Sequence, residues 1–451
     1  MNLLSVSVDS LCLQNQFKFI NYMNPLIKEL KERGLYSQTF GNLEECFSKP
    51  TVFYLGLDPT SDSLGIHHMV GLMVSRLMQQ YGHKPIILVG GATCAIGDPS
   101  GKSEERKAIS METVFHNVEC VKKQISKIID FDSDAPNAAI MVNNWDWYKD
   151  YKFLDFIRDV GKKITVNYLM AKENVRKRLE REGNGISFQE FSYGLLQGYD
   201  FVHLYQNYGC TLQIAGTDNL GNMVTGQDLV HKMLGKDDVC GLTWDLITCA
   251  DGRKFGKTEG NSVWLDPKKT SPYQFMQYWL NVSDVDAEVF IKKFTLTPLD
   301  EIEKMIERHR ENPSARILQK ELAKYMTCLV HSEEEYNKAV KATEILFGKG
   351  TREQLETIDE DSLLAAMDGV CTVEVPKEQF TSGVSVVDLA AMHDKVPSKT
   401  EARKLIKSNG FSINKVKPDS EKDVIMSQYL IRGKYLLLQK GKKDYCLVKA
   451  V

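Results

Sequence analysis

The chain has 451 residues, enough for about three domains, and its 43% hydrophobic and 26% charged residues are typical of soluble globular proteins. It contains no apolar run of membrane-spanning length, and its N-terminus lacks the basic start and long apolar run of a signal peptide, so we expect no membrane contact and a cytoplasmic location. The ten cysteines include no C-x-x-C pair, which argues against zinc ribbons and disulfide scaffolds and favours a reducing compartment.

The net charge of −3 is unevenly distributed. Residues 391–451 hold 14 Lys and Arg against 6 Asp and Glu. Such a basic end on an acidic body indicates either a polyanion partner or a solvated charged face. Charge alone favours the solvated face.

The first half of the chain predicts a parallel sheet. Residues 23–34 form a short amphipathic pattern ended by Gly34. The β-rich run VFYLGL is followed, after a DPT turn, by a helical apolar stripe of Ile66, Met69, Val70, Met73, Val74 and Leu77. KPIILVGGAT then predicts a buried strand that enters a glycine turn. Strand, helix and strand at this spacing indicate a βαβ unit.

The second half predicts mainly helices. Residues 153–208 are helical in pattern, and a capping box, Ser187-x-x-Glu190, opens a helix that Gly209 ends. CGLTWDLIT and NSVWLDP flank a glycine-rich loop, and residues 271–347 are mostly helical. Residues 351–379 are acidic and poorly periodic, which predicts a linker. A second capping box, Ser398-x-x-Glu401, opens the last helix, and short strands follow.

The stretch DPTSDSLGIHHM carries two adjacent histidines, His67 and His68, at a helix start. Neighbouring side chains on a helix point about 100° apart, so we do not expect the two histidines to bind one metal ion. Two interpretations remain: polar residues that fill the first turn, or a helix N-terminus that meets a phosphate.

Two glycine-rich loops carry basic residues. GDPSGKSEER fails as a P-loop because Ile96 stands where glycine is needed, yet it carries Asp98, Lys102 and Arg106. DGRKFGKTEG carries Lys254 and Lys257 between glycines. Each loop alone is typical of a solvated surface turn.

Tyr193, Gln197 and Asp200 are spaced i, i+4 and i+7 on the capped helix, so they share one face. This polar stripe is either exposed or directed into a polar pocket, and the spacing favours neither.

In combination these motifs resemble bacterial-type tyrosyl-tRNA synthetases, which are class I aminoacyl-tRNA synthetases. The resemblance runs from about Asn24 to the C-terminus and is carried by YLGLDPT, LVGGAT, IGDPSGKSEER, VNNWDW, DVGKKITVNYLMAKE, FSYGLLQGYDF, LQIAGTD, KFGKT and SPYQF. It implies an α/β fold with a Rossmann-like parallel-sheet catalytic domain, an α-helical domain and a small α+β S4-like RNA-binding domain. The implied divisions are an N-terminal extension at 1–22, then 23–248, 249–350, an acidic linker at 351–380, and 381–451.

The resemblance also implies the reaction and the partners. Tyrosine carboxylate attacks ATP to form tyrosyl-adenylate, which then acylates the 3′ end of tRNA(Tyr). ATP is expected with Mg²⁺ but without a dedicated protein metal site, and the chain is expected to be a homodimer. Binding of tRNA by the basic end should fall steeply with salt.

By resemblance, the site residues fall into four groups. The tyrosine-binding group is Tyr54, Asp98, Tyr193, Gln197, Asp200 and Gln213. The catalytic group on the phosphates is Thr60, His68, Lys102, Arg106, Lys254 and Lys257. The remaining ATP-binding group is Gly56, Asp58, Gly65, His67, Gly216, Asp218 and Asn219. The RNA-binding group is Arg403, Lys404 and Lys407.

The sequence departs from the family pattern at two places. The signature His-Ile-Gly-His reads Gly65-Ile66-His67-His68, so we expect His67 to crowd the adenine and one phosphate donor to be missing. Exchanging residues 65 and 67 should then raise the activation rate, whereas an unchanged or lower rate would mean that the site has adapted to His67. Asn219-Leu220 stands where the family has Gln-Trp, and the shorter Asn219 is expected not to reach the substrate.

Three hypotheses follow. The first is an active tyrosine–tRNA ligase with a divergent nucleotide site, because the pocket, both lysine loops and the basic end are kept. The second is a degenerate paralogue that binds tyrosine or RNA with weak or no activation. The third, a ligase that passes tyrosyl-adenylate to another acceptor, is disfavoured by the S4-like end.

Overall fold

The computed structural model describes residues 23–99, 109–180, 185–258, 261–348, 350–441 and 444–451. These residues divide into two compact units, one formed by residues up to 266 together with 280–326, and the other by 267–279 and 327–451. In the described residues no helix is both long enough and apolar enough to cross a membrane.

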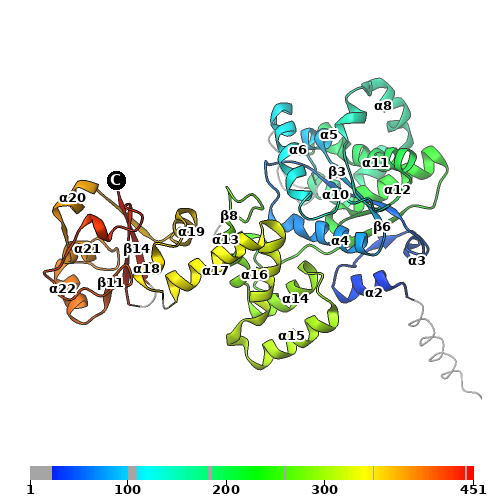
Figure 1. The fold of residues 1–451 in the computed structure, drawn as a ribbon. Helices are drawn as coiled ribbons and strands as arrows, with labels where there is room; N and C mark the ends of the chain where they lie inside the picture. Colours follow the sequence, from blue (N-terminus) through cyan, green and yellow to red (C-terminus); the bar gives the residue numbers. More distant parts are fainter. Residues whose placement is uncertain (1–22, 100–108, 181–184, 259–260, 349, 442–443) are drawn as a thin grey trace, which may run out of the picture. The chain divides into compact units, whose positions relative to one another are not determined.

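Six described strands form the sheet at the centre of the first unit (Figure 1). The order is β1–β6–β5–β2–β3–β4, and every neighbouring pair is parallel except β1 with β6. The bounds are β1 Thr39–Phe40, β2 Val52–Leu57, β3 Lys84–Val89, β4 Ile140–Asn143, β5 Cys210–Gly216 and β6 Cys240–Trp244. The predicted α/β fold with a parallel sheet is confirmed.

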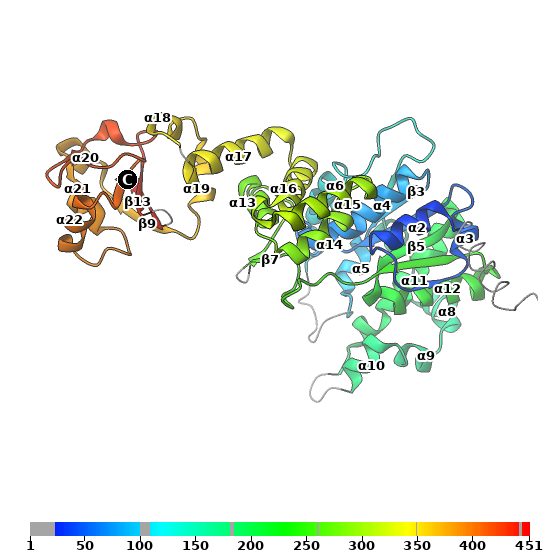
Figure 2. The same ribbon diagram turned by 90° about the horizontal axis from the view of Figure 1, so that it is seen from below.

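Helices cover both faces of this sheet (Figure 2). Helix α4, Met69–Gln80, connects β2 to β3, and α12, Leu220–Leu234, connects β5 to β6 in the opposite direction along the sheet. Because such crossovers are right-handed, α4 and α12 lie on opposite faces. Helix α11, Phe188–Tyr208, packs along α12. Every member of the predicted apolar stripe from Ile66 to Leu77 is buried.

The other described helices of the first unit surround this core. They are α2 Pro25–Glu32, α3 Leu43–Cys46, α5 Gly91–Ile96, α6 Met111–Ile125, α7 Trp145–Tyr148, α8 Phe153–Asp159, α9 Val166–Met170, α10 Glu173–Leu179, α14 Asp284–Phe294 and α15 Leu299–Glu311, with α16 Ile317–Val330 at the division between units. Ser187 caps α11 by accepting from the Glu190 backbone N–H at 3.2 Å, whereas the Glu190 carboxylate binds buried Arg178 at 2.8 Å. The predicted cap is therefore present, and its glutamate has a tertiary partner.

The second unit contains a four-stranded sheet in the order β11–β13–β14–β9. Its strands are β9 Cys371–Val375, β11 Phe411–Ile413, β13 Tyr435–Lys440 and β14 Asp444–Ala450. Its helices are α13 Pro272–Leu280, α17 Glu333–Phe347, α18 Arg352–Leu355, α19 Glu360–Ala366, α20 Lys377–Ser382, α21 Val386–Ala391 and α22 Lys399–Lys407, and β10 Val384–Ser385 pairs with β12 Val424–Ile425. Helix α22 buries Ala402 and Ile406, half-buries Leu405 and exposes its basic residues.

The structure differs from the expected linker at residues 351–380. This segment contains α18, α19, β9 and the start of α20. The Arg432 guanidinium donates to the Ile358 carbonyl at 2.6 Å, and Lys434 and Tyr435 both bind Glu360. Glu353 of α18 and Glu360 and Asp361 of α19 sit in the first turns of helices too short to show a clear period, so composition alone resembled a linker.

Asn414 is a local anchor of the C-terminal sheet. It is 1% exposed, its backbone has a φ of 48°, its Oδ1 accepts from the Leu437 N–H at 2.8 Å, and its Nδ2 donates to the Tyr429 carbonyl at 2.6 Å. We predict that Asn414→Ala destabilises the C-terminal domain by about 2–4 kcal/mol, because two buried backbone groups lose their partner.

Hydrogen exchange of the β13 and β14 amides in the full chain measures this loss. Asn409→Ala is the matched control, because Asn409 is exposed and has a similar φ of 55°. Equal acceleration of exchange in both variants would show that backbone strain, and not the Asn414 hydrogen bonds, accounts for the effect.

Candidate functional site

The strand order reverses between β2 and β5, and open parallel sheets bind ligands beyond the carboxyl ends of strands at such a point. Tyr54 of β2 and Gln213 of β5 are paired neighbours there, and both are buried. Within the described residues the Tyr54 hydroxyl and Gln213 Oε1 have no hydrogen-bond partner. Since buried polar atoms are normally paired, these two indicate a polar ligand.

Asp200 of α11 is a buried carboxylate, 2% exposed, in the same region. Its Oδ1 accepts from Trp147 Nε1 at 2.9 Å, and its Oδ2 accepts from Asn144 Nδ2 at 3.1 Å. Burial raises the pKa of Asp200 to about 7, although these two donors favour the charged form. The Trp147 ring is held by stacking on His203, with centroids 4.2 Å apart.

The rest of the polar stripe on α11 is also turned inward. Tyr193 is buried, and its hydroxyl donates to Asp58 at 2.9 Å, while Gln197 Oε1 accepts from Asn222 Nδ2 at 2.9 Å. Burial, with the negative charges of Asp58 and then Asp98, raises the pKa of Tyr193 well above its ordinary value. Of the two interpretations that the sequence left open, the polar pocket is therefore correct.

The double-histidine stretch forms a tight turn at the start of α4. Residues Ile66–His68 form a short 3-10 helix, and the Gly65 N–H donates to His68 Nδ1 at 3.1 Å. His67 is exposed, as is Thr60 earlier in the same stretch.

The glycine-rich loop that carries Lys254 and Lys257, called the lysine loop below, lies against this turn. The Ile66 N–H donates to the Val263 carbonyl at 2.9 Å, and the Val263 N–H donates to the Gly256 carbonyl at 3.0 Å. A Cβ on Gly256 would come within 2.7 Å of Ile66 Cγ2, and its φ of 81° also favours glycine. Phe255 anchors the loop in the core against α14. Lys254 and Lys257, on either side of this anchor, are exposed.

The turn after β5 holds the third part of the site. A Cβ on Gly216 would lie 2.6 Å from an Asp218 carboxylate oxygen, so glycine leaves room for that carboxylate. Desolvation, and then the charge of Asp98, raises the pKa of Asp218, and the Asn219 side chain hydrogen-bonds to it. In this structure the Asn219 side chain therefore binds the Asp218 carboxylate.

The remaining predicted residues divide between the two units and the undescribed parts. Gly56 is the penultimate residue of β2, whereas Lys102 and Arg106 lie outside the described residues. Arg403, Lys404 and Lys407 belong to α22 of the second unit. Within the described residues no group of three or more His, Cys, Asp or Glu side chains could hold a metal ion.

Comparison with known proteins identifies the family. A family model described as tRNA synthetases class I (W and Y) matches residues 48–348, and one described as the tyrosine–tRNA ligase SYY-like C-terminal domain matches residues 363–448. The tyrosine–tRNA ligase of Bacteroides thetaiotaomicron is 52% identical over 427 residues, which cover 94% of this chain and 99% of that protein. The chain belongs to the tyrosine–tRNA ligase family.

Other members of the tyrosine–tRNA ligase family agree in sequence and fold. The ligase of Porphyromonas gingivalis is 52% identical over 425 residues, covering 94% of this chain and 99% of that protein. A C-terminally truncated mitochondrial tyrosyl-tRNA synthetase of Aspergillus nidulans superposes with a TM-score of 0.64 at 28% identity, covering 71% of this chain and 94% of that one.

Sequence reasoning missed the residues that hold the predicted ones in place. Asn144, which is fully buried, donates to both Asp200 and Thr93, and Thr93 in turn donates to Asp58 at 2.7 Å. The available signal was the family motif VNNWDW, in which one polar residue ends the strand β4 and a second, Asn144, follows it directly. Asn222 carried no such signal.

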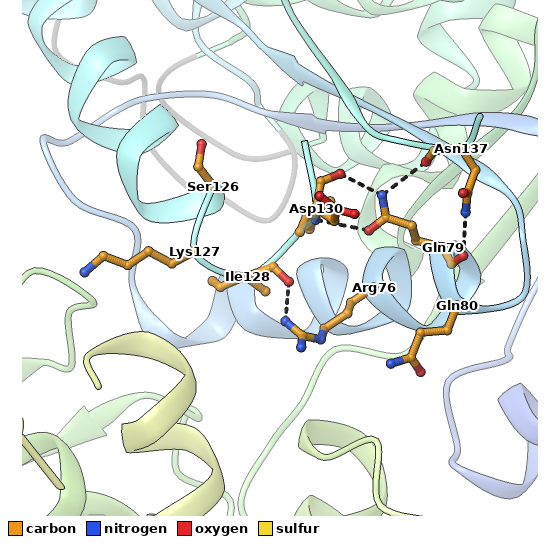
Figure 3. Close-up of a pocket in the computed structure, with 9 residues that line it drawn as sticks. Arg76, Gln79, Gln80, Ser126, Lys127, Ile128, Asp130 and Asn137 are labelled. Atoms are coloured by element: carbon orange, nitrogen blue, oxygen red, sulfur yellow. Dashed lines mark hydrogen bonds between the residues drawn. The ribbon is translucent and has the colours of Figure 1, made fainter. Parts of the chain in front are cut away.

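A surface hollow of about 440 Å³ lies where α4 meets the segment after α6 (Figure 3). No predicted site residue lines it. Its polar groups bind one another: Gln79 Nε2 donates to the carbonyls of Asp130 and Asn137, and Arg76 donates to that of Ile128. The hollow therefore lies at the packing contact between α4 and the segment that leads to β4.

The raised pKa of Asp200 predicts a pH-dependent stability of the ligand-free chain. The folded chain keeps a proton on Asp200 up to about pH 7, whereas an unfolded carboxyl releases it near pH 4. Stability from this group is complete below the unfolded pKa and is lost as the pH rises towards the folded pKa. Asp200→Asn removes the dependence.

Urea unfolding of both proteins measures the difference. Between about pH 5 and about pH 6.5, the wild-type free energy of unfolding should fall by about 2 kcal/mol more than that of the variant. Parallel pH dependence of the two proteins would contradict the assigned pKa.

Proposed function

We propose that the chain activates L-tyrosine with ATP and transfers it to the 3′ end of tRNA(Tyr). The observation that carries this proposal is a set of buried polar groups, the unpartnered Tyr54 hydroxyl and Gln213 Oε1 with the Asp200 carboxylate, which we infer to line a slot for the substrate side chain. A phenolic hydroxyl can donate to Asp200 and accept from Tyr54. Phenylalanine would leave the Tyr54 hydroxyl unpaired and would bring no further donor to Asp200, at a cost of several kcal/mol that discriminates strongly against it.

The far end of the slot suits the substrate ammonium group. Asp98, Tyr193 and Gln197 are assigned to it, because a carboxylate and two oxygen acceptors complement a cation. Tyr193 is fixed by donating its proton to Asp58, so its oxygen lone pairs remain for the ammonium. Asn222 donates to Gln197 and so directs that amide.

Activation needs no covalent enzyme intermediate. The tyrosine carboxylate oxygen attacks the α-phosphorus of ATP, the bond to the β-phosphate oxygen breaks, and pyrophosphate leaves. Thr60, His68, Lys254 and Lys257 are assigned to stabilise the developing charge on the leaving phosphates, and Lys102 and Arg106 are added by resemblance. Mg²⁺ arrives with ATP as part of the substrate.

The nucleoside is assigned to the turns at the ends of β2 and β5. Gly56, Asp58, Gly65 and His67 come from the first, and Gly216, Asp218 and Asn219 from the second. A carboxylate such as Asp218 can accept hydrogen bonds from both ribose hydroxyls.

The second unit is assigned to tRNA. Arg403, Lys404 and Lys407 extend from α22 and are exposed, which suits contacts with phosphates. The nine described cysteines are all free thiols, which agrees with the proposed location in the cytoplasm.

Tyrosine-dependent ATP–pyrophosphate exchange tests the activation step. We predict robust exchange by the wild type and a loss of about 10² to 10³ or more when Lys254→Ala is combined with Lys257→Ala, because both phosphate donors are removed. Lys236→Ala is the matched control, an exposed lysine in the loop after α12. Tyrosine binding without exchange would instead support the degenerate paralogue.

The proposed homodimer is supported by large exposed apolar side chains on three helices of the first unit. Phe153 and Leu154 of α8 are 66% and 76% exposed, Val166 of α9 is 59% exposed, and Phe188 at the start of α11 is 67% exposed. Exposed apolar side chains are typical of protein interfaces, and a twofold dimer buries the same residues on both copies.

We predict that Leu154→Asp weakens the dimer about tenfold or more, because each interface would then bury an unpaired charge. Sedimentation velocity across a concentration series measures this change. Val285→Asp on α14 is the control, since Val285 is 66% exposed but lies apart from these elements. A monomeric wild type, or an unchanged Leu154→Asp dimer, would refute the assignment.

A further inference from the structure

The imidazole of His67 takes the space that a side chain at residue 65 would occupy. A Cβ built on Gly65 would lie 2.7 Å from His67 Cε1 and 2.8 Å from His67 Nδ1. Carbon atoms in contact are normally about 3.5–4.0 Å apart. A side chain at position 65 and the His67 ring in this position therefore exclude each other.

The geometry of the turn places the His67 ring over Gly65. The His67 and His68 rings lie 4.0 Å apart at 38°, so each limits the rotation of the other. The His68 ring is itself fixed, because its Nδ1 accepts from the Gly65 N–H, while the His68 N–H donates to the Gly65 carbonyl at 3.0 Å. Both imidazoles thus belong to one closed turn.

His67 also faces the lysine loop. A Cβ on Gly256 would lie 3.8 Å from the His67 backbone nitrogen, so the loop passes directly over this residue. Desolvation lowers the pKa of His67, and the positive charge of Lys257 lowers it further. An imidazole can donate an N–H, and this one lies beside a lysine assigned to the leaving phosphates.

We infer that His67 supplies, from position 67, the imidazole N–H to the ATP phosphates that Gly65 cannot supply. This inference rests on the proposed activation reaction. It replaces the expectation that exchanging residues 65 and 67 raises the activation rate. The two departures in Gly65-Ile66-His67-His68 are one compensated exchange, because the loss of a side chain at 65 opens the space that the new ring fills. The turn keeps two imidazoles in place of losing one.

The alternative is that His67 only fills space. A filler contributes packing, and its removal would change stability without changing the handling of phosphates. A donor to the leaving phosphates contributes most in the transition state, so its removal lowers the rate constant of activation by about 10² to 10³. Removal of a filler therefore changes the stability of the fold, whereas removal of a phosphate donor changes the rate constant of activation.

The test compares His67→Gly, Gly65→His and the double variant Gly65→His with His67→Gly. We expect His67→Gly to lose about 10² to 10³ in the rate of tyrosine-dependent ATP–pyrophosphate exchange, with unchanged tyrosine affinity and unchanged midpoint of unfolding. Gly65→His alone should also lose activity, since it displaces the His67 ring. The double variant should recover most of the loss, because it returns a single imidazole to the same space.

Two further measurements complete the test. Exposed His116 on α6 provides the control His116→Ala, which should leave exchange unchanged. Calorimetric affinity for ATP with Mg²⁺ should fall about tenfold in His67→Gly and recover in the double variant. Unchanged ATP affinity and exchange in His67→Gly, or a double variant no better than His67→Gly, would overturn the inference. A wild type that binds ATP without exchange would refute the proposed reaction, and the ATP affinities would still decide the role of His67.

Discussion

The hydrogen bonds of the buried Asp200 carboxylate constrain the whole catalytic unit, because a charged group taken out of water must be given partners. Asn144 and Trp147 supply two donors; Asn144 follows directly on β4, and Trp147 lies in α7, the helix that comes next. Asn144 continues to Thr93 and Thr93 to Asp58, so one chain of hydrogen bonds links α11, β4, α5 and the end of β2. The strand order reverses between β2 and β5 at this point, and the unpartnered atoms of Tyr54 and Gln213 lie on these two strands.

A second constraint connects the nucleotide end of the site. Residues 63–67 and the segment around 256–266 are bound by successive backbone contacts, among them Leu265 N–H to the Leu64 carbonyl at 2.9 Å and Ile66 N–H to the Val263 carbonyl. Phe255 fixes the loop in the core, so Lys254 and Lys257 are carried on a short, anchored segment. A change at residue 65 therefore alters the space open to the His67 ring, which lies beside the same loop. This proximity explains how two departures from a family signature can offset each other within one turn.

The sequence predicted the parts of this fold that depend on local patterns. The apolar stripe of α4, the caps of α11 and α22, and the common face of Tyr193, Gln197 and Asp200 follow from helical periodicity and capping chemistry. The segment at 351–380 was expected to be a linker because its short helices are stabilised by contacts with distant residues such as Arg432. Asn144 was missed because its role is defined by partners far along the chain, and the direction of the His67 ring depends on a space at Gly65 that composition does not reveal.

The most direct measurement is a crystal structure of the chain with bound L-tyrosine. We expect the phenolic oxygen within about 3 Å of both the Tyr54 hydroxyl and an Asp200 carboxylate oxygen, with the ammonium group towards Asp98 and Gln197. Tyrosine bound elsewhere, or a site closed by the protein's own side chains, would contradict the proposed function.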